Sequence, residues 1–272
     1  MQDLWNSTPA FGFPYAASAS APGVPYGAQI DGARGQDVAG LTAYVLWNES
    51  LYGELGVYRS AKQGTTGPLD STTAGGVVKG GAPYWRFAYE HNTGRHSIEA
   101  GVYGMQFDIY PDFGAGFGQE LSGPADRYQD VAEDVQYQFT GDQHLFSFEA
   151  TRIHESQTLN ATFAAAKSDS LRNDLTTLRA FGTYYYKRKI GGTLGYFSTT
   201  GSTDATFLGN ISGQPDTKGW IAEVNYLPWL NAKLSLQYVN YSKYSGLGTN
   251  YDGAGRNASD NNTIYALVWL SY

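Results

Sequence analysis

The sequence predicts an all-β fold, an antiparallel transmembrane β-barrel, and three observations lead to it. The first is the last thirteen residues, in which the side chains alternate in steps of two. One face of this stretch is apolar and consists of Ile264, Ala266, Val268, Leu270 and the terminal aromatic residue Tyr272. A period of two is typical of a β-strand whose two faces meet different surroundings.

The second observation is the composition. The 272 residues allow one large domain, and the chain is 15% aromatic but only 16% charged. A mean hydropathy of -0.38 is compatible with a membrane strand, because such a strand needs apolar residues on its lipid face alone. The absence of cysteine excludes disulfides, thiolate metal sites and thioether attachment of haem to this chain. The net charge of -7 gives no basic stripe, so we expect no nucleic-acid partner.

The strands follow one another at regular intervals after a loop rich in Gly, Pro, Ala and Ser at residues 1–40. In residues 41–272 apolar and polar side chains alternate along successive strands, which predicts that this range forms the β-barrel. Strands are predicted at 41–48, 51–60, 83–91, 96–110, 128–140, 144–155, 175–187, 192–200, 217–227, 232–242 and the terminal stretch, which makes about eleven. The phase of the alternation slips near Gly104, which predicts a β-bulge there.

The third observation is that short and long connections take turns. Tight turns join the strands of each hairpin, whereas loops at 61–81, 111–127, 156–174, 201–216 and 243–262 separate the hairpins. Outer-membrane barrels have short periplasmic turns and long extracellular loops, and a soluble β-sandwich has no reason for this asymmetry. Tyr and Trp at the strand ends fit interfacial girdles. The pattern therefore predicts a bacterial outer-membrane location, with residues 1–40 on the extracellular side. Because such barrels have even strand numbers, eleven strands imply either an odd number of further strands before residue 1, which we favour, or a strand count that is wrong by one.

The candidate site residues are charged side chains opposite the apolar positions of their strands. We expect them to line the lumen, where they either border an aqueous path or pair to stabilise the interior: Glu54, Arg86, Glu90, Asp134, Arg152, Glu223 and Lys233. Val268, Leu270 and Tyr272 are the candidate assembly signal. His154, near the outer end of its strand, is the one histidine considered for a metal ion or haem edge, but the histidine spacing predicts no metal site. No catalytic constellation is found, and we expect no enzymatic activity.

Four stretches carry a resemblance to a known family: Asp3–Tyr15, Leu194–Ala205, Asp216–Trp229 and Asn250–Trp269. They resemble the porin portion of fused cytochrome–porin outer-membrane proteins of the iron-oxidation type. The resemblance implies a barrel of about sixteen strands and an amino-terminal haem c segment with a C-x-x-C-H motif. This chain has no such motif, so the resemblance places the haem on a segment absent from it.

The resemblance implies a barrel that sheathes a haem segment for extracellular electron transfer. The alternatives are a passive diffusion channel for small solutes and a structural or adhesive surface barrel. The expected partners are outer-membrane lipid, the barrel assembly machinery and a c-type cytochrome.

Overall fold

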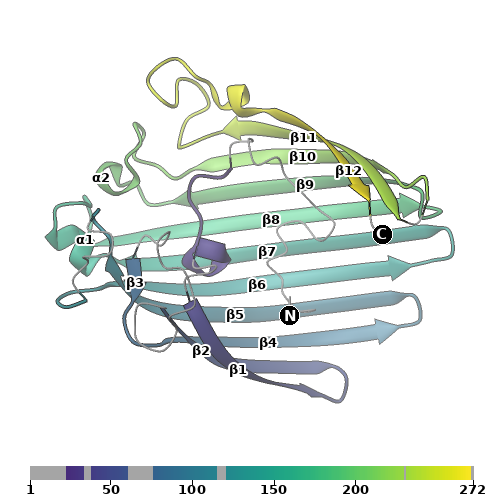
Figure 1. The fold of residues 1–272 in the computed structure, drawn as a ribbon, viewed down its shortest axis with the longest axis horizontal. Coiled ribbons are helices and arrows are strands. Elements are labelled where there is room, and N and C mark those ends of the chain that lie inside the picture. Colours follow the sequence, from purple (N-terminus) through teal and green to yellow (C-terminus); the bar gives the residue numbers. More distant parts are fainter. Residues whose placement is uncertain (1–22, 34–37, 61–75, 115–120, 230, 271–272) are drawn as a thin grey trace.

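The computed structural model describes residues 23–33, 38–60, 76–114, 121–229 and 231–270. They form one antiparallel sheet of 12 strands, and eleven of these lie side by side in the order of the chain (Figure 1). The predicted all-β antiparallel fold is confirmed. No helix in the described ranges is both long and apolar enough to cross a membrane.

The element bounds agree closely with the predicted strands. The strands are β1 (Val38–Trp47), β2 (Leu51–Ser60), β3 (Gly76–Val78), β4 (Ala82–Thr93), β5 (His96–Pro111), β6 (Asp126–Thr140), β7 (His144–Thr158), β8 (Arg172–Tyr186), β9 (Ile190–Gly201), β10 (Thr217–Tyr226), β11 (Ala232–Lys243) and β12 (Thr263–Leu270). The short helices are η1 (Gln29–Ala33), α1 (Asn160–Ala164), α2 (Ala205–Leu208) and η3 (Ala258–Asn261).

Two details differ from the prediction. The short strand β3 lies inside the predicted loop 61–81 and pairs with β5. The predicted bulge near Gly104 is wrong, because β5 keeps one continuous register with β4 and with β6. The inward-facing residues of β5 instead change from polar Glu99 to apolar Tyr103, Met105 and Phe107, all of them buried. In the sequence, this change from polar to apolar residues on the inward face looks like a shift of the alternation by one residue, although the register does not change.

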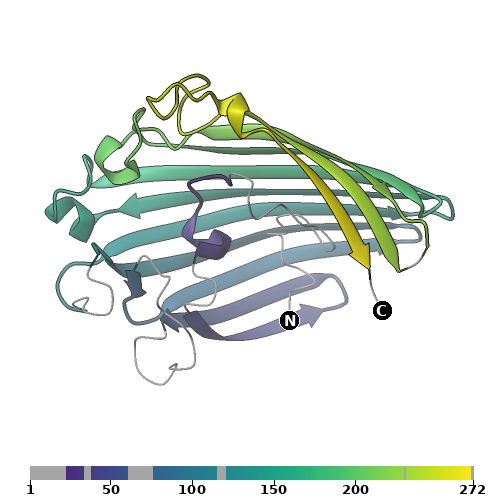
Figure 2. The ribbon, with the colours of Figure 1, turned by 45° about the horizontal axis from the view of Figure 1, so that its top comes forward.

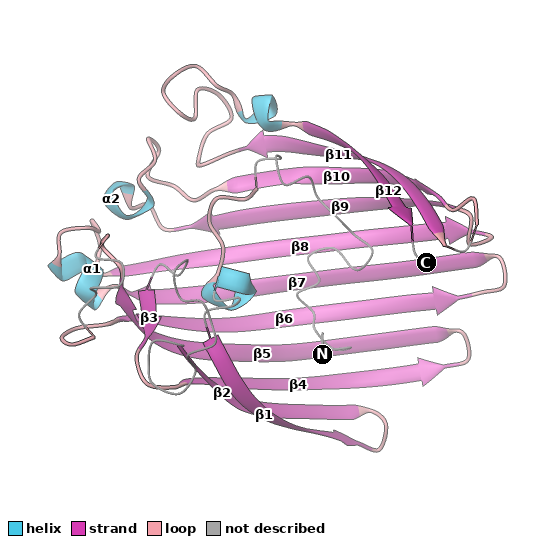
Figure 3. Ribbon diagram, viewed as in Figure 1, coloured by secondary structure: helices cyan, strands magenta, loops and turns pink. Residues whose placement is uncertain are grey.

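The sheet curls into a trough, open along one side (Figure 2). Among the described residues no pairing joins β1 to β12, so the barrel is not closed. Tight turns lie at one end of the strands, and α1, α2 and η3 lie with the longer loops at the other (Figure 3). We call these the turn end and the loop end.

The two faces of the sheet have the inverse of the polarity found in soluble proteins. In β10 the concave face buries Glu223 and Asn225, whereas Val224 between them is 62% exposed on the convex face. Charged side chains are almost never buried in soluble proteins unless they are paired, and large aliphatic side chains usually are. The same inversion recurs in β12, where Ile264 and Val268 are exposed. The predicted faces of the terminal strand are confirmed for residues 263–270.

Exposed aromatic side chains of the convex face gather near the turn end. This group consists of Trp47, Tyr89, Phe146, Tyr184, Tyr186 and Tyr226. A smaller group, Tyr196, Trp220 and Tyr238, lies further toward the loop end, and the rings of Tyr196 and Trp220 are 4.8 Å apart. Beyond it the convex face becomes polar, as the ion pair Arg127–Asp108 at 2.8 Å shows.

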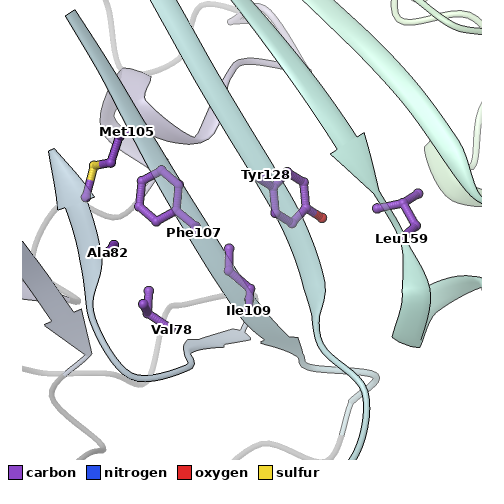
Figure 4. Close-up of a cluster of buried hydrophobic side chains, with 7 residues drawn as sticks. All are labelled: Val78, Ala82, Met105, Phe107, Ile109, Tyr128 and Leu159. Carbon is purple, nitrogen blue, oxygen red and sulfur yellow. The ribbon is translucent and has the colours of Figure 1, made fainter. Parts of the chain in front are cut away.

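Near the loop end the concave face carries an apolar cluster beside the buried carboxylates of Asp126, Asp130 and Glu155. It consists of Val78, Ala82, Met105, Phe107, Ile109, Tyr128 and Leu159 (Figure 4). Ile30 from the amino-terminal segment and Phe207 from α2 pack against this cluster. The loop end is therefore covered from inside by chain segments.

Inward glycines give room to aromatic rings on neighbouring strands. Gly195 in β9 lies directly opposite Phe181 in β8, and a Cβ atom there would lie 2.3 Å from the Phe181 ring. Phe181 is held in a buried cluster with Phe197, Ile221 and Tyr241, so the ring has little freedom to move away. Glycine at this position is a packing requirement.

We expect Gly195→Ala to lower the free energy of unfolding by about 1–3 kcal/mol, because the added methyl group overpacks the Phe181 cluster. Gly182→Ala is the matched control on the partner strand, where the nearest atom to an added Cβ would be Cε2 of Phe146 at 3.9 Å. Urea unfolding of the two variants checks this. Equal destabilisation by both substitutions would contradict the packing argument.

Candidate functional site: the polar interior of the sheet

The centre of the polar interior is a buried ion-pair cluster on β4, β5 and β6. Arg86 Nη1 lies 2.5 Å from Asp134 Oδ2, and Arg86 Nη2 lies 2.6 Å from Glu99 Oε1. Gly101 lies opposite Asp134 in the register, and a Cβ atom there would come within 2.9 Å of the guanidinium. Strand alternation thus brings the three charges to one face, and glycine leaves space between them.

A second cluster lies on β10 and β11. Lys233 Nζ is 3.3 Å from Glu223 Oε1, and Gln237 Nε2 donates to Glu223 Oε2 at 2.9 Å. Ser235 Oγ donates to Asn225 Oδ1 at 2.6 Å in the next row. Each buried charge in this cluster therefore has a hydrogen-bonded partner, which is the usual condition for burying a charge.

Six of the seven predicted lumen residues lie on the concave face. Five are buried: Glu54, Arg86, Asp134, Glu223 and Lys233. Glu90 is half-buried and accepts a hydrogen bond from Asn92 Nδ2 at 2.6 Å.

The structure places Arg152 on the convex face, contrary to the prediction, where its Nη1 lies 3.7 Å from Glu133 Oε2 and both side chains are exposed. Arg152 is four residues from Phe148 on β7, so both side chains lie on the convex face. Toward the loop end this face changes from apolar to polar residues, and Arg152 lies in the polar part. A charged residue in a strand is therefore not by itself evidence for the lumen.

The other predicted residues lie as follows. Val268 and Leu270 are exposed on the convex face, and Tyr272 lies outside the described residues. His154 faces outward, where its Nδ1 lies 3.1 Å from Thr176 Oγ1. The described part of the chain holds no group of three or more His, Asp or Glu residues that could bind a metal ion.

Carboxylates outnumber cations among the inward-facing strand residues near and between these clusters. The carboxylates are Glu54, Glu90, Glu99, Asp126, Asp130, Asp134, Glu149, Glu155 and Glu223, and the cations are Arg86, Arg179 and Lys233. An interior with this excess of negative charge favours cations over anions.

Residues 23–33 of the chain lie in the concavity (Figures 1 and 2). The backbone N–H of Gln29 donates to Glu155 Oε2 at 2.6 Å, and that of Ile30 donates to Asp130 Oδ2 at 2.9 Å. Arg179 Nη1 donates to Asp31 Oδ1 at 3.0 Å. Because these partners come from β6, β7 and β8, the segment is fastened across the inner wall.

The side chains of the same segment continue this attachment. Ala28 is buried with Tyr103, Ala132 and Ile153 of the wall. Tyr26 Oη donates to the Leu208 carbonyl at 2.6 Å, which links the segment to α2. Hydrogen bonding and apolar contact together hold the segment inside.

Asp204, the residue before α2, organises the loops at this end. Its carboxylate accepts hydrogen bonds from the backbone N–H groups of Asp169 and Phe207, both at 2.9 Å, and from Asn173 Nδ2 at 2.8 Å. Ser168 Oγ donates to it at 2.5 Å. Burial alone would raise the pKa of this carboxyl, but the hydrogen bonds outweigh burial and lower the pKa to about 2.

Sequence reasoning missed several of these residues for two different reasons. Glu99 alternates with the apolar residues Ile98 and Ala100 of its strand, so alternation alone could have found it. Asp130, Glu155 and Asp31 are different, because they meet partners about a hundred residues or more away along the chain. No local sequence pattern predicts a contact between residues so far apart in the chain.

Comparisons with known proteins give matches among solved structures only. No family model and no curated protein matches the chain. Among solved structures, it is similar to OmpT, an outer membrane protein of Vibrio cholerae, at 13% identity and a TM-score of 0.35. The likeness covers 86% of this chain and 89% of that one. The geometry of the two faces is therefore the basis for proposing a function.

We expect Arg86→Met to destabilise the protein by about 3–5 kcal/mol, because it leaves Glu99 and Asp134 buried without their cation. Arg95→Met is the control, since Arg95 pairs with Asp142 at the exposed turn end, and we expect a loss of less than about 1 kcal/mol. Urea unfolding checks both values. A loss at Arg86 no larger than at Arg95 would show that the buried cluster does not stabilise the wall.

The Asp204 carboxyl predicts a pH-dependent stability. Its pKa is lower in the folded protein than the ordinary value near 3.8, so its contribution is present above about pH 4 and is lost as pH falls through about 2. The difference in unfolding free energy between the wild type and Asp204→Asn should therefore shrink by roughly 2 kcal/mol over this range. A difference that stays constant from pH 5 to pH 2 would refute the assignment.

Proposed function

We propose that this chain forms the wall of a porin-like outer-membrane barrel. The observation that carries the proposal is the inverted polarity of the sheet: exposed aliphatic side chains and aromatic groups on the convex face, buried charges on the concave face. Hydrocarbon would cover the convex face and give it the apolar surrounding that water cannot. The tight turns would then face the periplasm and the longer loops the outside.

Within this class we propose a sheath, a wall that encloses a polypeptide segment in its interior. The support is that residues 23–33 lie against the concave face, fastened to Asp130, Glu155 and Arg179. This arrangement agrees with the resemblance to cytochrome–porins of the iron-oxidation type, in which the barrel encloses a haem segment. The chain's role in such a protein is to insulate and present the segment, with outer-membrane lipid, the assembly machinery and a c-type cytochrome as partners, and without enzymatic activity.

The residues of this chain do not themselves fit a covalently bound haem. The sequence has no cysteine for thioether bonds. His96 and His144 bond to Tyr137 and Tyr184 among exposed residues at the turn end, and His154 faces outward as well. We therefore assign no electron-transfer step to any residue here, and the sheath proposal places haem on another polypeptide segment.

A passive channel for cations is the second candidate. The excess of carboxylates on the concave face favours it. The two candidates differ in the role of residues 23–33. In a sheath these residues block the passage of solutes through the interior, whereas in a channel they leave a passage open.

The membrane assignment predicts different effects of arginine on adjacent residues of β7. Phe148 lies on the convex face in the middle of the apolar band, and Ser147 lies on the concave face at the same depth. Phe148→Arg should destabilise the lipid-inserted protein by about 2–4 kcal/mol, whereas Ser147→Arg should cost much less. Urea unfolding in lipid vesicles measures both. Equal tolerance of the two arginines would refute the lipid-facing assignment.

Single-channel conductance in planar bilayers separates the sheath from the channel. The sheath predicts a low conductance for the full chain, and a higher one for Arg179→Ala, which loses the ion pair to Asp31. Arg95→Ala, at the exposed turn end, is the control and should leave the conductance low. A high conductance that Arg179→Ala does not change would favour the passive channel.

A further inference from the structure

The turn between β8 and β9 concentrates positive charge at the turn end of the sheet (Figure 1). Residues 187–189 of this turn read Lys-Arg-Lys, all three are exposed, and none forms an ion pair with a described residue. Neighbouring turns have no such excess, because Arg95 and Asp142 pair with each other at 3.1 Å and the turn between β1 and β2 carries Glu49. In a chain with a net charge of -7, this turn is a local exception.

The ammonium group of Lys187 lies on the convex side of the wall. The row of side chains next to the turn consists of Tyr186, Ile190 and Tyr226, which are opposite one another in the register and exposed on the convex face. Lys187 Nζ lies 5.2 Å from the centre of the Tyr186 ring. A cation that covers an apolar row in this way keeps its stem on the hydrophobic surface and its charge in water.

The backbone of the turn does not explain why it carries cations. Lys187 and Arg188 have φ angles of 49° and 56°. Positive φ at both central residues of a turn favours Asn-Gly and is less favourable for long side chains. The turn between β1 and β2 has nearly the same φ angles, 50° at Asn48 and 54° at Glu49, without any cation. The charges of residues 187–189 therefore have a cause other than the hairpin itself.

We propose that residues 187–189 bind the phosphate headgroup of an anionic phospholipid. The convex row beside the turn contacts the upper part of the acyl chains, and the three cations lie beyond it, at the level of the phosphates. Basic side chains next to a membrane attract anionic lipids. Phosphatidylglycerol leaves its phosphate charge unbalanced, whereas the choline of phosphatidylcholine neutralises it. The proposal rests on the proposed membrane location and adds the class of lipid that one turn selects.

The test places one fluorophore beside this turn, on Ile190→Cys, in a sequence that has no other cysteine. The full chain is inserted into phosphatidylcholine vesicles that contain a small fraction of phosphatidylglycerol or phosphatidylcholine with a nitroxide near the top of the acyl chain. The nitroxide quenches the fluorophore only at short range. We expect phosphatidylglycerol to quench at least about threefold more efficiently than phosphatidylcholine at equal mole fraction.

The reference site is Leu51→Cys, beside the turn between β1 and β2. Leu51 is exposed on the convex face in a similar row, with Trp47 and Tyr89 opposite it in the register. Because the adjacent turn carries Glu49 instead of cations, we expect the two lipids to quench this label equally.

Two double substitutions exchange the charges of the turns. Lys187→Asn with Arg188→Gly introduces the residues that this backbone favours, so the hairpin should still form, and the excess quenching at Ile190→Cys should fall by more than half. Asn48→Lys with Glu49→Arg should create an excess at Leu51→Cys.

Equal quenching of Ile190→Cys by the two lipids would overturn the proposal and leave an acidic segment of another protein as the partner of these cations. An excess that survives Lys187→Asn with Arg188→Gly would also overturn it. Weak quenching by both lipids at both sites would contradict the membrane location itself, so the two failures can be distinguished.

Discussion

The structure depends on one constraint: each strand carries an apolar face and a polar face, and hydrogen bonds to its neighbours decide which way each one points. In a period-2 strand, a shift of register by one residue exchanges the two faces, so pairing and polarity must agree along the whole sheet. They agree from the turn end to the middle of the strands in all eleven consecutive strands from β1 to β12, and the polarity changes only toward the loop end. The same constraint applies at the margins. In hydrocarbon the edges of β1 and β12 need partners, and because both strands run in the same direction, antiparallel closure requires an odd number of further strands.

The interior follows from this arrangement. Strand alternation places Arg86, Glu99 and Asp134 on the concave face. Their charges can be buried there because Arg86 forms ion pairs with both carboxylates. Toward the loop end the concave face changes to apolar residues such as Phe107, and the amino-terminal segment packs where that change occurs. The backbone N–H groups of Gln29 and Ile30 donate hydrogen bonds to the carboxylates of Glu155 and Asp130. The amino-terminal segment and the buried carboxylates of the wall thus supply each other with hydrogen-bond partners. The amino-terminal segment and the polar wall are thus two parts of one structure.

Sequence reasoning reached the strands and their faces because both are local properties. Alternation from Leu51 to Ser60 predicts β2 with the bounds that the structure has. The prediction of faces failed where the polarity of a side chain does not indicate which face it lies on. Arg152 is charged but faces outward, and near Gly104 the inward-facing residues become apolar. It could not reach the attachment of residues 23–33, because the pair Gln29–Glu155 is separated by 126 positions and neither residue has a distinguishing neighbourhood. Loop-end contacts such as those of Asp204 depend on how the strands place the loops.

The central claim is that the convex face contacts lipid and the concave face contacts water. The sequence has no cysteine, so single cysteines introduced at positions 145–150 of β7 can each carry one spin label without removing a native thiol. Collision of the label with oxygen, which concentrates in hydrocarbon, and with a water-soluble nickel chelate can be measured in lipid vesicles. The account predicts oxygen maxima at Phe146, Phe148 and Ala150 and nickel maxima at Leu145, Ser147 and Glu149. Nickel accessibility at both sets of positions, without the two-residue period, would contradict it.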